Sequence, residues 1–153
     1  MVKRLSGINQ IRGGKGLELS KKRLAALEED FEDYCQIDRL IAIRSLEIEH
    51  PWRESDGNIG GGRASTINKP QESITLKKEA DKQLNRLLSL RRQGDNAINR
   101  MNDEQLSIFS IRFKSDDYYD WDTIGELTHN SHSQIYRKRY KILELLANEQ
   151  GIC

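Results

Sequence analysis

A chain of 153 residues is long enough for one compact domain, or for a small domain with a helical extension. Hydrophobic residues make up 36% and charged residues 32% of it, and no apolar run approaches the roughly eighteen residues that cross a bilayer, which excludes a membrane-spanning protein. Only two prolines interrupt a composition rich in helix-forming residues, so we expect an all-α fold. The two cysteines, Cys35 and Cys153, have no metal-ligand spacing and fit a reducing, cytosolic compartment.

Charge is segregated along the chain although the net charge is only +1. Residues 1–23 carry seven Lys or Arg against one acid, whereas residues 24–38 carry six acids and no Lys or Arg. Residues 132–143 carry four Lys or Arg and no acid. Because a phosphate backbone responds to the local field, the small net charge does not exclude nucleic-acid binding.

The first half of the chain divides into a basic arm, a helix and a glycine-rich segment. Four glycines among basic residues predict a flexible arm over residues 1–19. Apolar residues spaced by three and four predict one helix over residues 20–50, with Ser20 as its N-cap and Pro51 beyond its end.

The glycine-rich segment covers residues 51–70 and contains Gly60, Gly61, Gly62 and Arg63. A phosphate-binding P-loop needs Gly-Lys-Ser/Thr after a strand, and Arg63 follows the glycines here, so nucleotide hydrolysis is excluded. Two interpretations remain: a mobile linker, which the composition favours, or a loop that lies on a nucleic-acid backbone.

Residues 71–153 are predicted to form a helical domain. A helix is expected from Gln71 to near Arg100, with Gly94-Asp95 as its weakest point. Asn102 is a predicted N-cap, and it precedes a short amphipathic helix that ends near Phe113.

Residues 122–149 show the pattern of two helices joined by a tight turn. Over residues 122–128 a short helix would bury Ile124 and Leu127, and Gly125 would permit a close helix crossing. The spacing of Ser131 and Gln134 predicts a capping box at the start of a longer helix. This arrangement predicts a helix-turn-helix within residues 102–149, with His129 or Asn130 in a left-handed conformation at the turn. His129 and His132 lack the further ligands that zinc requires, so we expect no metal and no cofactor.

Two motifs resemble those of known families of transcription proteins. The residues Ile124-Gly125-Glu126-Leu127, then Ser131 and Ile135, resemble region 4 of bacterial sigma factors. The glycine-rich segment, from Pro51-Trp52 through Asn58-Ile59-Gly60-Gly61-Gly62-Arg63 to Ser65, resembles the RinA-type phage late-gene transcription activators, which pair it with a sigma-region-4-like C-terminus. The resemblance covers about two thirds of the chain, and the turn Thr128-His129-Asn130 and Lys138 depart from the usual pattern.

The resemblance implies binding to double-stranded DNA at a late promoter and activation of packaging and structural genes with the host RNA polymerase, in the cytoplasm of the bacterial host cell. Arg137 is the expected guanine contact, and Lys138, Arg139 and Lys141 are expected to hold phosphates. The predicted DNA-binding residues are Ser131, His132, Ser133, Gln134, Tyr136, Arg137, Lys138, Tyr140 and Lys141, with Gly60, Gly61, Gly62 and Arg63 of the glycine-rich segment. Ile124, Leu127, Ile135, Leu143 and Leu146 are the predicted core.

Two other functions stay open. A DNA-packaging initiation protein, similar to a small terminase subunit, would also bind DNA but would form a ring. A helical adaptor would bind RNA polymerase without reading DNA. An enzyme is not expected, because no nucleophile has an adjacent base and no acid pair has supporting residues. The sequence leaves the number of subunits open, with a homodimer as one option.

Overall fold

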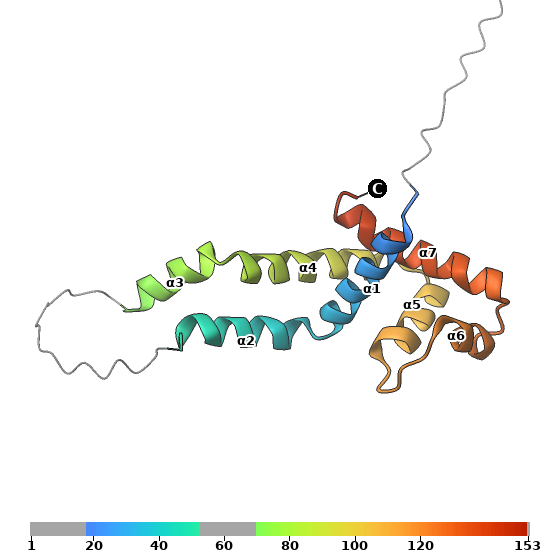
Figure 1. Ribbon diagram of the computed structural model, residues 1–153, viewed down its shortest axis with the longest axis horizontal. Helices are drawn as coiled ribbons and strands as arrows, with labels where there is room; N and C mark the ends of the chain where they lie inside the picture. Colours follow the sequence, from blue (N-terminus) through green and yellow to red (C-terminus); the bar gives the residue numbers. More distant parts are fainter. Residues whose placement is uncertain (1–17, 53–69, 153) are drawn as a thin grey trace, which may run out of the picture.

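The computed structural model describes residues 18–52 and 70–152, and these residues form helices joined by short connections, with no strand among them (Figure 1). The predicted all-α class is therefore confirmed for this part of the chain. No helix in the same two ranges has the length and apolar character needed to cross a membrane. The basic arm up to residue 17 and the glycine-rich residues Gly60, Gly61, Gly62 and Arg63 lie outside the described residues. The elements are α1 (Lys21–Cys35), α2 (Ile37–Glu49), α3 (Pro70–Ala80), α4 (Lys82–Asn99), α5 (Asp103–Phe109), the π-helical turn η1 (Ser110–Lys114), α6 (Trp121–Leu127) and α7 (His132–Glu149).

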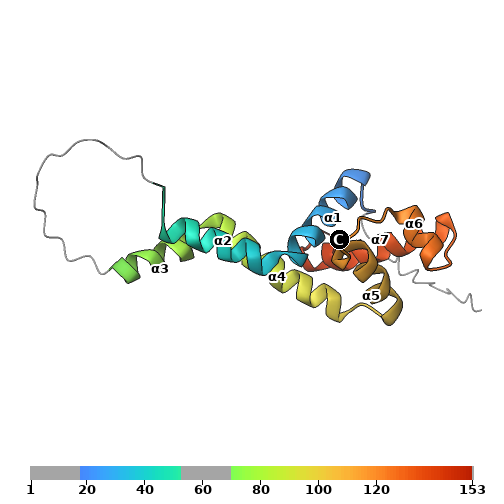
Figure 2. The same cartoon turned by 90° about the horizontal axis from the view of Figure 1, so that it is seen from below.

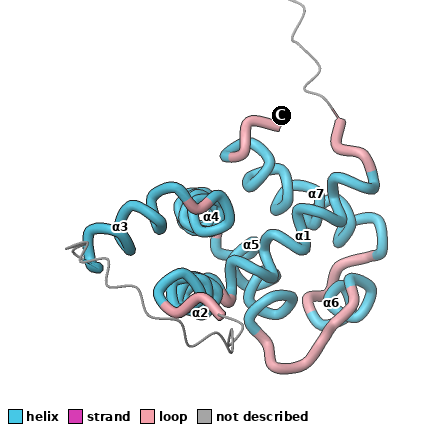
Figure 3. The backbone as a smooth tube through the Cα atoms, turned by 60° about the vertical axis from the view of Figure 1, so that its left-hand side comes forward, coloured by secondary structure: helices cyan, strands magenta, loops and turns pink. Residues whose placement is uncertain are grey.

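The elements form a body and a helical arm, called the arm from here on and different from the basic arm predicted over residues 1–19 (Figures 1 and 2). The body consists of α1, α5, η1, α6, α7 and the C-terminal end of α4, and the arm consists of α2 beside α3 and the start of α4. Figure 3 shows α2 and α4 side by side, on the opposite side of α5 from α6 and α7. One apolar core fills the body; its buried members include Leu27, Phe31, Ile108, Phe109, Phe113, Trp121, Ile124, Ile135, Ile142, Leu143 and Leu146.

The predicted single helix over residues 20–50 is two helices, α1 and α2. Ser20 caps α1 as expected, because its side chain accepts a hydrogen bond from the backbone N–H of Arg23 at 3.3 Å. The helix breaks at Gln36, whose φ of −111° and ψ of 15° are not helical. The two halves pack on different partners: Phe31 is buried in the body, whereas Ile37 packs with Leu87 and Leu90 in the arm. The apolar spacing continues without interruption from α1 into α2, so the sequence gives no sign of this change of partner. The predicted end of the helical segment before Pro51 is confirmed, because α2 ends at Glu49.

The predicted helix from Gln71 to Arg100 also divides, at Asp81. The Asp81 carboxylate caps α4 by accepting a hydrogen bond from the backbone N–H of Leu84 at 2.7 Å. It also accepts hydrogen bonds from the guanidinium of Arg44 on α2, at 3.1 and 2.6 Å. The bond from Arg44, followed by that from Leu84, lowers the pKa of Asp81 to about 2. The break thus anchors the start of α4 to α2.

The predicted weak point at Gly94-Asp95 is wrong, because α4 continues through it to Asn99. The ring of Tyr34 lies directly on Gly94: a Cβ atom at that position would be 2.1 Å from Cδ2 of Tyr34. The Tyr34 hydroxyl donates a hydrogen bond to the Asp95 carboxylate at 2.5 Å. Burial, and then this bond, raise the pKa of Tyr34 well above its usual range, so the phenol stays a donor. Gly94 is therefore a packing glycine that lets α1 approach α4.

Candidate nucleic-acid interface

Helix α6 begins at the N-cap Asp120. Its carboxylate accepts a hydrogen bond from the backbone N–H of Thr123 at 2.7 Å, and the bonds from Thr123, the side chain first and then the backbone, hold the pKa of Asp120 below its usual range. Trp121 and Ile124 are buried in the core, whereas Leu127, which we expected there, is 55% exposed. The buried face of α6 is centred on Trp121, Ile124 and Gly125, and Leu127 lies on its flank.

The turn between α6 and α7 follows the expected plan. His129 has a φ of 57°, the left-handed conformation predicted for this turn. The backbone N–H of Asn130 donates to the carbonyl of Gly125 at 2.8 Å, which closes the turn. A Cβ atom on Gly125 would lie only 3.1 Å from the backbone carbonyl oxygen of Asn130 and 3.2 Å from Cγ2 of Ile135. The predicted close crossing at Gly125 is therefore present.

Helix α7 starts with the predicted capping box. The Ser131 hydroxyl accepts from the backbone N–H of Gln134 at 3.3 Å, and the Gln134 side chain accepts from the backbone N–H of Ser131 at 2.9 Å. In the first turn, Nδ1 of His132 is 2.8 Å from the carboxylate of Asp122 on α6, and the His132 ring stacks on Tyr136 with centroids 4.5 Å apart. These contacts fix the start of α7 against α6.

One side of α7 is buried and the other is open. Ile135, Leu143 and Leu146 are fully buried, as predicted, and so is Ile142. The predicted contact residues that are exposed to solvent are Ser131, His132, Ser133, Gln134, Tyr136, Arg137 and Lys141. The side chain of Arg137 has no hydrogen bond or ion pair with any residue in the described ranges, whereas Nζ of Lys141 is 2.7 Å from the carboxylate of Glu144. Arg137 and Lys141 also line a shallow hollow of about 320 Å³ between α5 and α7.

Three of the predicted contact residues point to partners within the chain. Nζ of Lys138 donates to Oδ1 of Asn130 at 2.6 Å and also pairs with Glu104 of α5. Nε of Arg139 donates to the carboxylate of Glu28 at 2.7 Å. The hydroxyl of Tyr140, a predicted DNA-binding residue, accepts a hydrogen bond from the backbone N–H of Leu19 at 3.1 Å. Lys138 stands where an apolar residue is common in this motif, and its bond to Asn130 shows how the turn accommodates it.

Glu28 is a residue of this region that the sequence did not single out. One of its carboxylate oxygens accepts from Nε1 of Trp121 at 2.5 Å and from Nε of Arg139 at 2.7 Å. The side chains of Glu28 and Arg139 are only 16% and 19% exposed. Glu28 therefore joins α1 to both α6 and α7 and fixes their relative position. Its partners are 93 and 111 residues away along the chain, so no local pattern could reveal it.

Replacing Glu28 with alanine should lower the free energy of unfolding by about 2 kcal/mol, because Arg139 and the Trp121 indole would stay largely buried without their acceptor. Urea denaturation followed by circular dichroism measures the loss. Glu29→Ala is the matched control, since Glu29 is exposed on the same helix, and its change should stay within about 0.5 kcal/mol. Equal effects of the two substitutions would show that Glu28 does not bridge these helices.

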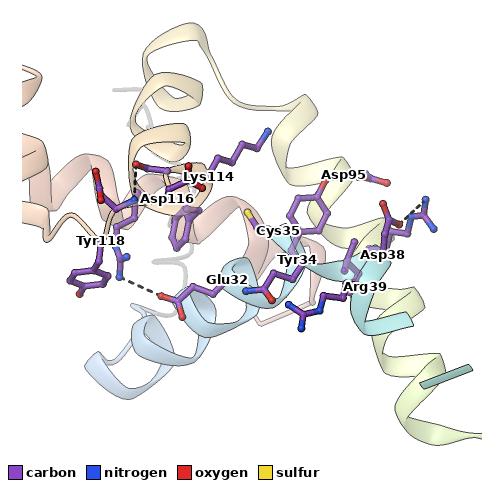
Figure 4. A pocket seen from close by; sticks show the side chains of 16 residues that line it. Glu32, Tyr34, Cys35, Asp38, Arg39, Asp95, Lys114, Asp116 and Tyr118 are labelled. Carbon is purple, nitrogen blue, oxygen red and sulfur yellow. Dashed lines mark hydrogen bonds and ion pairs between the residues drawn. The ribbon is translucent and has the colours of Figure 1, made fainter. Parts of the chain in front are cut away.

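A second hollow, of about 930 Å³, lies where the arm meets the body (Figure 4). Glu32, Cys35 and Arg39 line one side and Lys114, Asp116 and Tyr118 the other. Arg112 also lines it, with a side chain only 5% exposed and 3.5 Å from Glu32. Its guanidinium lies over the rings of Tyr118 and Trp121 at 4.6 and 5.8 Å, and its Nε has no hydrogen-bond partner among the described residues.

The residues around this second hollow suggest no catalytic chemistry. Burial raises the pKa of the Cys35 thiol, so it is a poor nucleophile. Acids and bases are mixed in the lining, which gives no preference for one sign of ligand charge. Within residues 18–52 and 70–152, no group of three His, Cys, Asp or Glu could hold a metal ion. The exposed side of α7 is therefore the better candidate site.

Comparisons with known proteins bear on the family alone. Neither the comparison with curated proteins nor that with solved structures gives a match. One family model matches residues 23–148, which include every helix from α2 to α6 and nearly all of α1 and α7. The chain belongs to the family described as "Protein of unknown function (DUF722)".

Proposed function

We propose that this protein is a sequence-specific DNA-binding transcription activator and that α6 and α7 form its helix-turn-helix. The observation that carries the proposal is the open side of α7. It presents His132, Ser133, Tyr136 and Arg137 in its first two turns, where the recognition helix of this motif contacts base edges. Arg137 has no acid partner in the described part of the chain, so its guanidinium is available to a guanine.

The charge around this face supports contact with phosphates. The bond between Leu19 and Tyr140 brings the start of α1 next to α7, and the first residues of α1 are Lys21, Lys22 and Arg23, all exposed. Basic residues from two elements thus lie near one another, although they are far apart in sequence. Phosphate contacts of this kind fix the register of a protein on DNA without reading its sequence.

The resemblance to RinA-type activators and to sigma region 4 makes the proposal more specific. It assigns the protein to the late genes of a phage, with the host RNA polymerase as the partner in activation. In this proposal the segment containing Gly60, Gly61, Gly62 and Arg63 also contacts DNA.

Arg137→Ala and Lys141→Ala should affect DNA binding in different ways. Arg137→Ala should weaken binding to the preferred promoter fragment by roughly 10- to 100-fold and leave binding to other fragments nearly unchanged, because it removes a base contact. Lys141→Ala should weaken binding to all fragments by a similar factor and reduce the slope of affinity against salt by about one, because it removes a phosphate contact. Titration of the full chain against phage genomic fragments at two salt concentrations measures both effects.

Gln150→Ala serves as the control, since Gln150 follows α7 and its side chain is hydrogen-bonded to Asp30. It should not alter binding. If Arg137→Ala and Lys141→Ala both bound the preferred fragment like the unmodified chain, α7 would not be the recognition helix.

A helical adaptor that binds polymerase without reading DNA is the second candidate. The observation that favours it is the internal pairing of basic residues on α7: Lys138, Arg139 and Lys141 each have an acid partner in the chain. An adaptor would shift no duplex even at low salt but would bind purified host polymerase. The same titration therefore separates the two functions.

A further inference from the structure

One side of helix α2 is exposed to solvent and carries large apolar side chains in its middle. Six residues at helical spacing are exposed along it: Arg39, Ala42, Ile43, Leu46, Glu47 and His50. Ile43 and Leu46 in its middle are 43% and 55% exposed. The other side of α2 is covered, because Ile37 packs with Leu87 and Leu90 of α4. The helix is thus apolar on its inner side and also at the centre of its outer side.

The charged ends of this open side are complementary to each other. Arg39 and Glu47 each lie four residues from Ile43, one toward the start of α2 and the other toward its end. If a second copy of α2 packs antiparallel with the two-fold axis at Ile43, Arg39 of each copy faces Glu47 of the other. A parallel pair would instead place Arg39 against Arg39, which is unfavourable. The charge order therefore selects an antiparallel second copy over a parallel one.

The side chains suit a close contact in this register. Leu46 of one copy faces the half-buried Leu40 of the other, and Ile43 meets its own symmetry mate. Ala42, beside Ile43, is small enough to let the two helices approach. Glu47 already accepts a bond from Arg44 at 2.8 Å, but its side chain stays 54% exposed. Arg44 is held mainly by Asp81, so Glu47 remains available to Arg39 of the second copy.

We propose that two copies of the protein associate through the open side of α2, antiparallel and centred on Ile43. The contact joins two hairpins of α2 with α3 and α4 into a bundle, in which Ile43 and Leu46 lose contact with water. Because each arm extends away from its body (Figures 1 and 2), the two bodies lie at opposite ends of the dimer. The proposal does not depend on DNA binding.

The mass of the full chain in solution tests the proposal. Light scattering and sedimentation equilibrium should give about twice the chain mass of 17.7 kDa for the unmodified protein. Ile43→Glu should raise the dissociation constant by about 30-fold or more, because it places two acids at the two-fold axis. Leu76→Glu is the matched control, since Leu76 is 65% exposed on α3 of the same arm, and it should leave the dimer intact. Circular dichroism verifies that each variant keeps its helices.

Charge reversal tests the antiparallel register itself. Arg39→Glu and Glu47→Arg should each raise the dissociation constant by about tenfold, because each places like charges opposite one another twice. The double variant should recover to within about threefold of the unmodified protein. A monomer at about 100 µM chain, or dissociation by Leu76→Glu in place of Ile43→Glu, would overturn the proposed interface. Failure of the double variant to recover would overturn the register.

Discussion

Phe31→Ala should lower the free energy of unfolding by about 3 to 5 kcal/mol, the largest single effect that we expect in this protein. Phe31 is fully buried, and its ring meets those of Phe109 and Phe113 at centroid distances of 5.0 and 5.4 Å. The substitution leaves a cavity between α1 and α5 and also removes the favourable edge contacts of the rings. Thermal denaturation should show a fall in Tm of roughly 10 °C for a chain of this length.

Two further variants define the cause of this loss. Phe31→Leu keeps most of the volume and should cost well under half as much. Trp52→Ala removes a larger aromatic side chain that is 84% exposed, and it should change stability by less than about 0.5 kcal/mol. A Phe31→Ala protein as stable as Trp52→Ala would mean that α1 does not close the core of the body.

Gly94→Ala should destabilise the protein by at least about 2 kcal/mol, although alanine favours an isolated helix over glycine by about 1 kcal/mol. The new Cβ would lie 2.1, 2.3 and 2.6 Å from three atoms of the Tyr34 ring, so the whole ring must move. Its movement would also break the 2.5 Å bond from the Tyr34 hydroxyl to Asp95. Urea denaturation of the purified chain measures the change.

The sign of this effect should reverse when Tyr34 is absent. In a Tyr34→Ala background the ring is gone, and Gly94→Ala should then be neutral or stabilising because only its helix propensity remains. The two substitutions are therefore strongly non-additive. Additive losses would show that Gly94 is required for a reason other than the approach of α1.

The features predicted correctly from the sequence are those that depend on nearby residues. The caps at Ser20, Asn102 and Ser131 each use a side chain and a backbone N–H three residues apart. The left-handed residue in the turn and the close crossing at Gly125 follow from the same short range. Capping chemistry and backbone sterics act locally, so a single sequence is enough to predict them.

The features that were missed depend on residues far apart in the chain. The single helix over residues 20–50 was wrong because α1 and α2 pack on different partners, and the break at Gly94 was wrong because Tyr34 fills the space beside that glycine. At the candidate site, the exposed start of α7 could be predicted. The inward partners of Lys138, Arg139 and Tyr140 could not, since they lie 34, 111 and 121 residues away.

The position of Phe31 against Phe109 has a consequence for synthesis on the ribosome. The two residues are 78 positions apart (109 − 31), and the arm is made between them. At roughly 5 to 20 residues per second, α1 leaves the ribosome several seconds before α5, α6 and α7 exist. Its apolar side, with Leu27 and Phe31, has no partner during that interval. The nascent chain therefore exposes, for a time, an apolar surface that the finished protein buries, and such surfaces make a chain prone to aggregation.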